Sequence, residues 1–219
     1  MKNIFFTSDT HFHHKNIVRG TTTWEVQEKG SNHGIQSLRD FDTLEEHDEA
    51  LIKSINSIVK YDDVLYHLGD WSFGGLEQVK KFRDRLECRE IHLIFGNHDE
   101  KIEDNKLDLS HSSCMGIQSL FSSTQYYKEL DLKIDSMKSG KYGKTNIVLS
   151  HYSHQVWNKS HKGAIHLFGH SHGSLKGIGK SMDVGVDTNN LYPYHLDEIL
   201  DIMKNIKTEI VDHHSSNTN

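Results

Sequence analysis

Short apolar runs recur along the chain, and five of them end in clusters of histidine, aspartate or asparagine. Runs of this length bounded by turn residues are typical of buried β-strands. The runs and the clusters that follow them are Ile4-Phe5-Phe6 before Asp9-Thr10-His11, Val64–Leu68 before Gly69-Asp70, Ile91–Phe95 before Gly96-Asn97-His98-Asp99, Ile147-Val148-Leu149 before His151, and Ile165–Phe168 before Gly169-His170-Ser171-His172. Open α/β sheets bind ligands beyond the carboxyl ends of their strands, so the pattern predicts one polar site where the five strand ends converge.

Helical patterns separate the first three runs. Thr43-Leu44-Glu45-Glu46 is a capping-box sequence, and the apolar positions behind it recur at helical spacing, which predicts a helix over 43–60. Gly74-Gly75 opens a second predicted helix. The alternation of these helices with strands favours right-handed βαβ crossovers and a mostly parallel sheet. The three strands are predicted at 3–8, 64–68 and 91–95.

The second half of the chain predicts shorter elements. Residues 126–134 partly alternate between apolar and polar, as a half-exposed strand does, and Gly140–Lys144 has the composition of a turn before a strand at 146–149. A last strand is predicted at 182–186. Pro193 is expected to start a final helix, because proline is well tolerated at the first helical position.

Composition then limits the class of protein. A chain of 219 residues, 35% of them hydrophobic, can bury one full core, so we expect a single domain over 1–212 and a disordered tail at 213–219. The polar segment 20–40 predicts a loop or lid. The formal net charge of -6 argues against a long nucleic-acid duplex as partner.

Cysteine use and hydropathy indicate a compartment. The two cysteines, Cys88 and Cys114, lack metal-type spacing, which favours reduced thiols in a cytoplasmic protein, or in the host cytoplasm if the chain is phage-encoded. No apolar run reaches the length of a signal peptide core or a membrane span, so no membrane partner is expected. The oligomeric state stays open.

Seven residues at the five strand ends are of types that bind first-row transition metals. Histidine nitrogens with carboxylate oxygens suit Mn, Fe, Co, Ni or Zn. One ion rarely needs so many protein ligands, whereas two ions sharing a carboxylate would use them all. The candidate metal ligands are Asp9, His11, Asp70, Asn97, His151, His170 and His172.

A formal charge count favours a phosphodiester as substrate. Two divalent ions bring four positive charges and Asp9 with Asp70 brings two negative ones, which leaves room for one bridging hydroxide and one phosphodiester anion. Adjacent side chains diverge, so His98 can face the leaving group while Asn97 faces a metal. An imidazole near its titration range can protonate a departing alkoxide. Asp99 is expected to hold that imidazole in orientation.

Each cluster has a structural alternative when it is taken alone, because Asp-x-His and Gly-Asp are common in turns. Structural roles are favoured for three histidines inside predicted strands and for two aspartates expected to cap or orient their neighbours. These residues are His67, His92, His166, Asp183 and Asp187. Lys159 and Lys162 are interpreted as solvated charges, with a phosphate contact as the less favoured alternative. Only the ordered recurrence of all five clusters favours one shared site.

In this order the motifs resemble the calcineurin-like metallophosphoesterase family. In this order, Gly96-Asn97-His98-Asp99 and Gly169-His170-Ser171-His172 are highly specific for the family. Ser8-Asp9-Thr10-His11-Phe12 is similar to the corresponding motif of a small bacterial and phage branch. The resemblance extends from Asp9 to His172. It implies a four-layer α/β/β/α sandwich with two mixed β-sheets and the site on loops at one edge.

The resemblance also implies a role for each residue of the site. Asp9, His11 and His172 would bind one ion, Asn97, His151 and His170 the other, and Asp70 would bridge the two. Hydroxide on the metals would attack phosphorus, with His98 assisting the leaving oxygen. Mn²⁺ is the expected ion, while Fe, Ni²⁺ or Zn²⁺ are also used across the family. The candidate substrate contacts are Asn16, Lys159 and Lys162.

These inferences predict a dinuclear metal-dependent phosphodiesterase acting on a small ester such as a nucleotide or cyclic nucleotide. A phosphomonoesterase or dinucleoside polyphosphate hydrolase stays open, and a nuclease or an inactive scaffold of the same fold is less favoured. The chain departs from many family members because no further aspartate follows shortly after Asp70. The double-arginine clamp of protein Ser/Thr phosphatases is not evident either, which disfavours that activity.

Overall fold

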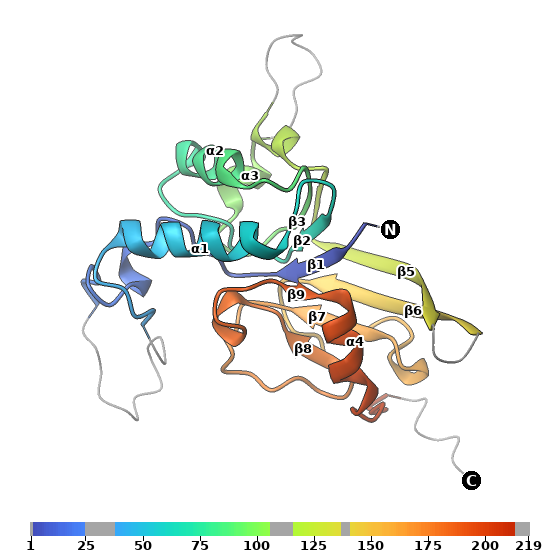
Figure 1. Ribbon diagram of the computed structural model, residues 1–219. Coiled ribbons are helices and arrows are strands. Elements are labelled where there is room, and N and C mark those ends of the chain that lie inside the picture. The colour runs from blue at the N-terminus through green and yellow to red at the C-terminus, as the bar shows by residue number, and fades with distance from the viewer. Residues whose placement is uncertain (1, 25–37, 106–115, 137–140, 213–219) are drawn as a thin grey trace.

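The computed structural model describes residues 2–24, 38–105, 116–136 and 141–212, with the side chains of 134–143 outside that description. Its strands form two β-sheets, and four α-helices accompany them in the described segments (Figure 1). Each sheet contains both parallel and antiparallel neighbours. The predicted α/β class with two mixed sheets is therefore confirmed.

The first sheet has five strands in the order β4-β3-β2-β1-β9. Strands β1 to β4 run parallel, while β9 is antiparallel to β1. The strands are β1 (Ile4–Thr7), β2 (Val64–His67), β3 (Glu90–Ile94), β4 (Ser123–Gln125) and β9 (Tyr194–His195). Thr7 is aligned with His67, and His67 with Leu93, so the carboxyl ends of three parallel strands lie side by side.

The second sheet has the order β5-β6-β7-β8. Strands β5 and β6 form an antiparallel hairpin, and β6, β7 and β8 are parallel. The strands are β5 (Tyr127–Ser136), β6 (Lys141–Ser150), β7 (Ile165–Phe168) and β8 (Ser181–Asp183). Because Leu149 is aligned with Leu167, the ends of β6 and β7 are adjacent, which brings His151 and His170 to one edge.

Two helices cover one face of the first sheet. α1 (Leu44–Ile58) connects β1 to β2, and α2 (Leu76–Arg85) connects β2 to β3. They contribute Leu51, Ile55, Val79 and Phe82 to a buried cluster that includes Phe5, Leu65 and Ile91 from the strands. Burying a side chain of this size stabilises the fold by about 1.5–3 kcal/mol.

The two sheets share a second apolar cluster. Phe6 and Leu68 from the first sheet pack with Leu149 and Leu167 from the second. α4 (Leu196–Lys204) adds Ile199 and Met203 to the same cluster. On its other face the second sheet packs Val148 against Trp157 and Ala164, which belong to the connection between β6 and β7.

The start of α1 confirms the capping prediction. The Thr43 hydroxyl accepts a hydrogen bond from the Glu46 N–H at 3.2 Å, and the Glu46 carboxylate accepts one from the Thr43 N–H at 3.1 Å. Two backbone N–H groups at the start of the helix, which have no carbonyl partner within it, are thus hydrogen-bonded by each other's side chains.

Three predicted boundaries are wrong. Pro193 does not start the final helix, because Tyr194–His195 first pairs with β1 and α4 begins only at Leu196. Strand β6 begins at Lys141, inside the predicted turn, because it pairs with β5 along its whole length. Strand β8 ends at Asp183 rather than at residue 186, since the Asp183 carboxylate accepts the Gly185 N–H and turns the chain.

Several short elements lie in stretches whose sequence is not periodic. They are the 3-10 helices η1 (Lys15–Ile17), η2 (Ile117–Leu120), η3 (Ser160–Lys162) and η4 (Val186–Thr188), the helix α3 (Glu100–Glu103) and the strand β4. None of the described helices has the length and apolar character needed to cross a membrane. Cys88 is a buried free thiol, whereas Cys114, the tail 213–219 and most of the predicted loop 20–40 lie outside the described residues.

Candidate metal centre

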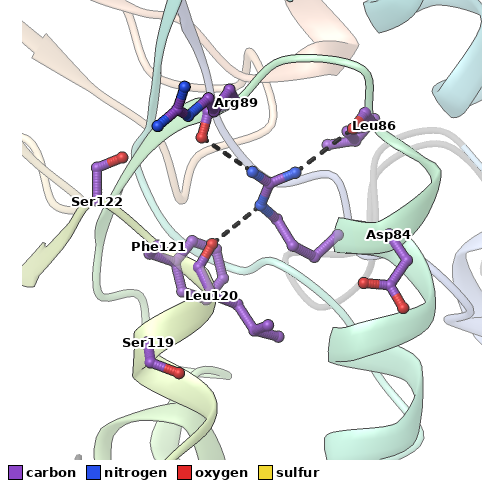
Figure 2. Close-up of a pocket in the computed structure, with 8 residues that line it drawn as sticks. Asp84, Leu86, Arg89, Ser119, Leu120, Phe121 and Ser122 are labelled. Carbon is purple, nitrogen blue, oxygen red and sulfur yellow. Dashed lines mark hydrogen bonds between the residues drawn. The ribbon is translucent and has the colours of Figure 1, made fainter. Parts of the chain in front are cut away.

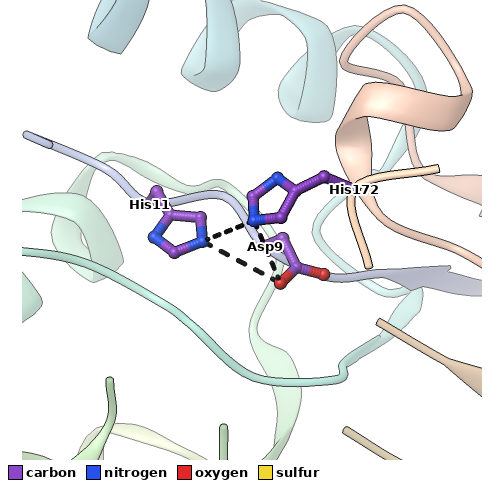
Figure 3. A group of neighbouring side chains, drawn as sticks. All are labelled: Asp9, His11 and His172. Carbon is purple, nitrogen blue, oxygen red and sulfur yellow. Dashed lines mark hydrogen bonds and ion pairs between the residues drawn. The ribbon is translucent and has the colours of Figure 1, made fainter. Parts of the chain in front are cut away.

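The first group of candidate ligands lies where β1 and β7 end. Asp9, His11 and His172 each offer a donor atom to a common point, and all three donors lie within 4.8 Å of one another (Figure 3). His11 Nε2 is 3.2 Å from His172 Nε2, and each of these nitrogens is 3.9 Å from Asp9 Oδ1. The three side chains predicted to hold one ion are therefore brought together.

The second group lies where β2, β3, β6 and β7 end. Asp70, His151 and His170 likewise offer donors within 4.8 Å of one another. Asn97 Oδ1 lies 3.1 Å from His151 Nε2 and 3.0 Å from His170 Nδ1, so its amide oxygen points at the same spot. This set matches the second predicted ion site.

Asp70 lies between the two groups. Its Oδ2 is 3.4 Å from His11 Nε2 and 3.7 Å from His151 Nε2, one histidine from each group. Its other oxygen, Oδ1, accepts the His98 backbone N–H at 2.9 Å, which orients the carboxylate. Asp70 therefore has the position that a carboxylate shared by two ions requires.

The backbone is left-handed at five of the seven candidate ligands. Asp9, His11, Asp70, His170 and His172 have φ of 54°, 45°, 57°, 66° and 47°. Aspartate and histidine tolerate this region better than most residues, yet it still costs of order 1–3 kcal/mol per residue. The ligands that follow β1, β2 and β7 therefore lie at left-handed turns, whereas Asn97 and His151 do not.

Two motif glycines allow close approach at the same place. A Cβ at Gly96 would lie 2.3 Å from Asp70 Oδ1, and one at Gly169 would lie 2.0 Å from Ser8 Oγ and 2.5 Å from Asp9 Oδ2. Any larger residue would push these carboxylates out of position. The glycines of both motifs are therefore required by the packing of the site.

Hydrogen bonds to the rear nitrogens direct two of the histidines. His151 Nδ1–H donates to the Leu68 carbonyl at 2.7 Å, and His172 Nδ1–H donates to Asp187 Oδ2 at 2.7 Å. Each bond leaves the Nε2 lone pair facing the site, which is the arrangement that metal-binding histidines commonly have. The prediction that Asp187 orients a neighbour is confirmed.

The electrostatics of the first group favour a bound cation. Burial raises the pKa of Asp9 to about 7, with the charge of His172 opposing this rise and that of Asp70 adding to it. Burial also lowers the pKa of His11 well below its usual range, so this imidazole is neutral, as a metal ligand must be. A carboxylate buried beside another one needs a nearby positive charge to stay ionised.

His172 and Asp187 are hydrogen-bonded within this group. Burial alone would lower the pKa of His172, but the hydrogen bond that His172 donates to Asp187 and the charges of Asp9 and Asp187 outweigh it and raise that pKa. Burial likewise opposes ionisation of Asp187, yet Arg39 and His172 hold its pKa well below the usual range. Asp187 therefore remains a carboxylate behind His172.

The His98 ring lies beside the first group, but Asp99 does not orient it. The His98 side chain is exposed, and its ring centroid is 5.6 Å from that of His11. Asp99 is 1% exposed and accepts the backbone N–H groups of Asp70, Trp71 and Gly96 at 2.8–2.9 Å. Three inward donors satisfy this carboxylate, so it positions the Asp70 loop instead of the His98 imidazole.

The contacts described for two of the candidate substrate residues are with other parts of the chain than the metal ligands. The amide oxygen of Asn16 accepts hydrogen bonds from the Thr23 N–H and hydroxyl, at 3.2 and 3.1 Å. Lys159 Nζ lies 3.7 Å from Asp131 Oδ1 in the middle of β5, and Lys162 belongs to η3 in the same connection. Asn16 therefore stabilises its own loop, and the solvated interpretation of Lys159 fits the structure.

Three strand histidines have the structural roles predicted for them. His67 Nδ1 accepts the Gly69 N–H, and its Nε2–H lies 2.9 Å from the Thr10 hydroxyl. His92 Nδ1 is 2.7 Å from the Ser123 hydroxyl. His166 Nδ1–H donates to the Val148 carbonyl at 3.1 Å, while its Nε2 accepts the His154 N–H at 3.0 Å.

Aromatic side chains flank the site, and the sequence patterns did not single them out. The Phe73 ring lies 3.7 Å from the His14 ring, stacked, and 4.8 Å from the His98 ring. Exposed Trp24 meets His14 edge-on at 5.7 Å, and exposed Tyr152 meets His170 edge-on at 4.7 Å. The only available signal was position, since Phe73 and Tyr152 follow the Asp70 and His151 motifs closely.

A pocket on another part of the surface is separate from these groups. It lies between the end of α2 and η2, and is lined by Arg83, Asp84, Leu86, Arg89 and residues 119–122 (Figure 2). Arg83 donates to the carbonyls of Leu86, Arg89 and Leu120. Its guanidinium is thus used to hold the chain rather than offered to a ligand.

Comparison with known proteins finds relatives and a protein of similar fold, but it assigns no activity. No family model matches the chain. The uncharacterized protein MJ1445 of Methanocaldococcus jannaschii is 33% identical over 102 residues, 46% of this chain and 48% of that protein, so the chain covers about half the length of this relative. The Gene 66 protein of Mycobacterium phage L5 is 26% identical over 227 residues, 95% of this chain and 98% of that protein.

One solved structure is similar over most of the chain. The crystal structure of the protein of unknown function AQ665 from Aquifex aeolicus has a TM-score of 0.59, with 20% identity, over 92% of this chain and 100% of that one. At this identity the likeness concerns the fold alone. The chain therefore shares its overall fold with the Aquifex aeolicus protein.

Proposed function

We propose that the chain is a dinuclear metal-dependent phosphoesterase that hydrolyses a small phosphodiester. The observation that carries this proposal is the position of Asp70, whose Oδ2 lies within 3.4 Å of His11 Nε2 and 3.7 Å of His151 Nε2. A single carboxylate oxygen between two three-residue ligand groups is what two ions about 3.5–4 Å apart would need.

The donor set fits two divalent first-row ions. Imidazole nitrogens, carboxylates and one amide oxygen suit Mn²⁺, Fe, Ni²⁺ or Zn²⁺, and Mn²⁺ is our first choice. Asp9 is fully buried, with its pKa raised to about 7, so a cation at this point would restore its ionised form. The first ion would be held by Asp9, His11 and His172, the second by Asn97, His151 and His170.

Bound ions would supply Lewis-acid activation of the phosphoryl group and of a water nucleophile. The chain's own residues would do the rest. Asp70 would hold the two ligand groups in one geometry, and His98 would donate a proton to the departing ester oxygen. The Phe73 ring, whose centroid is 4.8 Å from that of His98, limits where the imidazole can lie.

The formal charge count favours a diester over a monoester, because two divalent ions with Asp9 and Asp70 leave two positive charges for one hydroxide and one singly charged phosphate. Exposed Trp24 and Tyr152 at the two sides of the site favour a planar organic group such as a nucleobase, which aromatic side chains bind by stacking. We therefore propose a nucleotide or cyclic nucleotide as the natural class of substrate.

The proposal includes membership of the calcineurin-like metallophosphoesterase family and the four-layer α/β/β/α arrangement that the resemblance implies. They are supported by α1 and α2 on one face of the first sheet and by the apolar cluster between the two sheets. A cytoplasmic location is part of it as well, since Cys88 is a free thiol of the kind common in reducing compartments.

Hydrolysis by metal-stripped protein with Mn²⁺ added back tests the proposal. We expect turnover of bis(p-nitrophenyl) phosphate that depends on Mn²⁺ and exceeds turnover of p-nitrophenyl phosphate. Asp70→Asn is the matched variant, because it keeps the shape but removes the bridging charge, and it should lose activity by about 10²-fold or more together with metal occupancy. Turnover of the monoester alone would favour a phosphomonoesterase, and no turnover of any phosphate ester with two ions bound would overturn the proposal.

A further inference from the structure

We infer that Arg39 is the positioning residue that assembles the first ligand group, Asp9, His11 and His172, without a described hydrogen bond to the second group. This inference rests on the proposed two-ion site. Arg39 lies at the end of the polar segment 20–40, a stretch for which the sequence indicated no chemistry. Its side chain is buried, with 7% of the residue exposed.

Every N–H group of the Arg39 guanidinium has a partner. Nε and Nη2 donate to the two carboxylate oxygens of Asp187, both at 2.9 Å. Nη2 also donates to the Asp9 carbonyl at 2.6 Å, and Nη1 donates to the Thr10 carbonyl at 2.7 Å and to His47 Nε2 at 2.9 Å. A guanidinium with all five donors satisfied is held in one orientation.

The pair of hydrogen bonds from Arg39 to Asp187, called the fork below, acts on the first ligand group through His172. Asp187 accepts Nδ1–H of His172 at 2.7 Å while both of its oxygens are bonded to Arg39. Two parallel charge-assisted bonds fix the plane of that carboxylate. The plane of the carboxylate then sets the direction in which His172 Nε2 points.

The remaining donors act on the other two residues of the group. The carbonyls of Asp9 and Thr10 belong to the left-handed reversal that presents Asp9 and His11, whose φ angles are 54° and 45°. Buried carbonyls turned away from a sheet need donors, and Arg39 supplies them. Arg39 therefore acts on all three members of the first group.

The second group is held by other contacts in the described part of the chain. Asp70 is oriented by the His98 N–H and by the loop bonds of Asp99, while His151 is oriented by the Leu68 carbonyl. Arg39 itself is tied down by its backbone pairing beside Val18 and by His47, which bonds Asp48 on the same helix, α1. None of the hydrogen bonds described for Arg39 reaches the second group, although the two groups touch where the His170 N–H donates to the Asp9 carboxylate at 2.9 Å.

Metal stoichiometry tests this inference. Wild type and variants would be stripped of metal and titrated with Mn²⁺ by calorimetry, and bound ions counted after equilibrium dialysis. Arg39→Lys keeps the charge but loses the fork, so we expect one ion to bind as in wild type and the other 10–100-fold more weakly. Asp187→Asn should weaken the same single ion, and combining it with Arg39→Lys should add little.

The matched control is Arg83→Met. Arg83 is a partly buried arginine that donates to three backbone carbonyls, but it lies in the pocket between α2 and η2, so two ions should be retained. If Arg39→Lys or Asp187→Asn binds two ions with wild-type affinity, or if both ions weaken equally in a folded variant, the inference is wrong. A wild-type protein that binds no ion would instead overturn the proposed two-ion site itself.

Discussion

Left-handed backbone at five candidate ligands concentrates strain in one place. Asp9, His11, Asp70, His170 and His172 all have positive φ, and each follows the end of a β-strand. Such conformations persist only where the surroundings hold them, and they cluster at functional sites. Here the surroundings are named groups, namely the Arg39 donors, the Asp99 carboxylate and the close contacts at Gly96 and Gly169.

His98 gives the residue-scale prediction on catalysis. Its side chain is exposed, so His98→Ala should leave metal binding and folding intact. Loss of a general acid lowers kcat by about 10²–10⁴-fold, and more so for esters with poor leaving groups. The measurement is kcat over a series of aryl phosphodiesters whose leaving-group pKa varies. An equal loss across the series would count against proton donation.

At the scale of elements, the start of α1 supports both the core and the site. The helix buries Leu51, Ile52 and Ile55 against the first sheet, and its first turns carry His47 and Asp48. His47 bonds Arg39, and Asp48 accepts both the backbone N–H and the ring Nδ1 of His13. A single amphipathic helix therefore links the apolar core to the groups behind the first ligand set.

The capping box of α1 gives the element-scale prediction. Thr43→Ala removes the acceptor for the Glu46 N–H and should lower the free energy of unfolding by about 1 kcal/mol. Thr43→Ser keeps the hydroxyl and is the control, with an expected loss of only a few tenths. Urea unfolding followed by circular dichroism measures both variants. Equal losses for alanine and serine would show that the methyl group, and not the cap, stabilises the helix.

At the scale of the molecule, the site lies where two sheets meet at their strand ends. The first sheet contributes Asp9, His11, Asp70 and Asn97, and the second contributes His151, His170 and His172. The apolar cluster between Phe6, Leu68, Leu149 and Leu167 joins the two sheets directly behind these residues. The integrity of the site therefore depends on the packing of the whole molecule.

Buried neutral histidines predict how the stability of the molecule depends on pH. Burial lowers the pKa of His166 to about 4, so the unfolded chain binds this proton more readily than the folded one. The resulting stability is present above the unfolded pKa of about 6.5 and is lost as the pH falls from there toward 4. At most about 1.4 kcal/mol is lost per pH unit for one such group.

His166→Gln tests this prediction. The variant removes the titrating group, so the free energy of unfolding should fall less steeply between pH 6.5 and 4 than in wild type. The comparison uses the difference in slope, which is insensitive to carboxylates that titrate in both proteins. Parallel slopes would show that His166 does not contribute to acid unfolding.

The strand–helix order, the capping box and the seven candidate ligands follow from local patterns. Apolar runs and helical spacing are properties of adjacent residues, and a metal ligand must be one of few residue types, so these features could be predicted from the sequence. The single-domain organisation stays a prediction. The predicted activity also stays a prediction, which metal binding and hydrolysis measurements test.

Tertiary structure alone decided where the polar side chains point. Asp99 was expected to face its neighbour His98 but turns inward to three N–H groups of two loops, because those donors are closer than the solvent-facing imidazole. Arg39 and Asp187 are 148 residues apart and carry no shared pattern, yet they pair behind His172. Local sequence determined which residues could bind metal, whereas long-range packing decided which contacts hold them, because hydrogen-bond partners are selected by proximity in space.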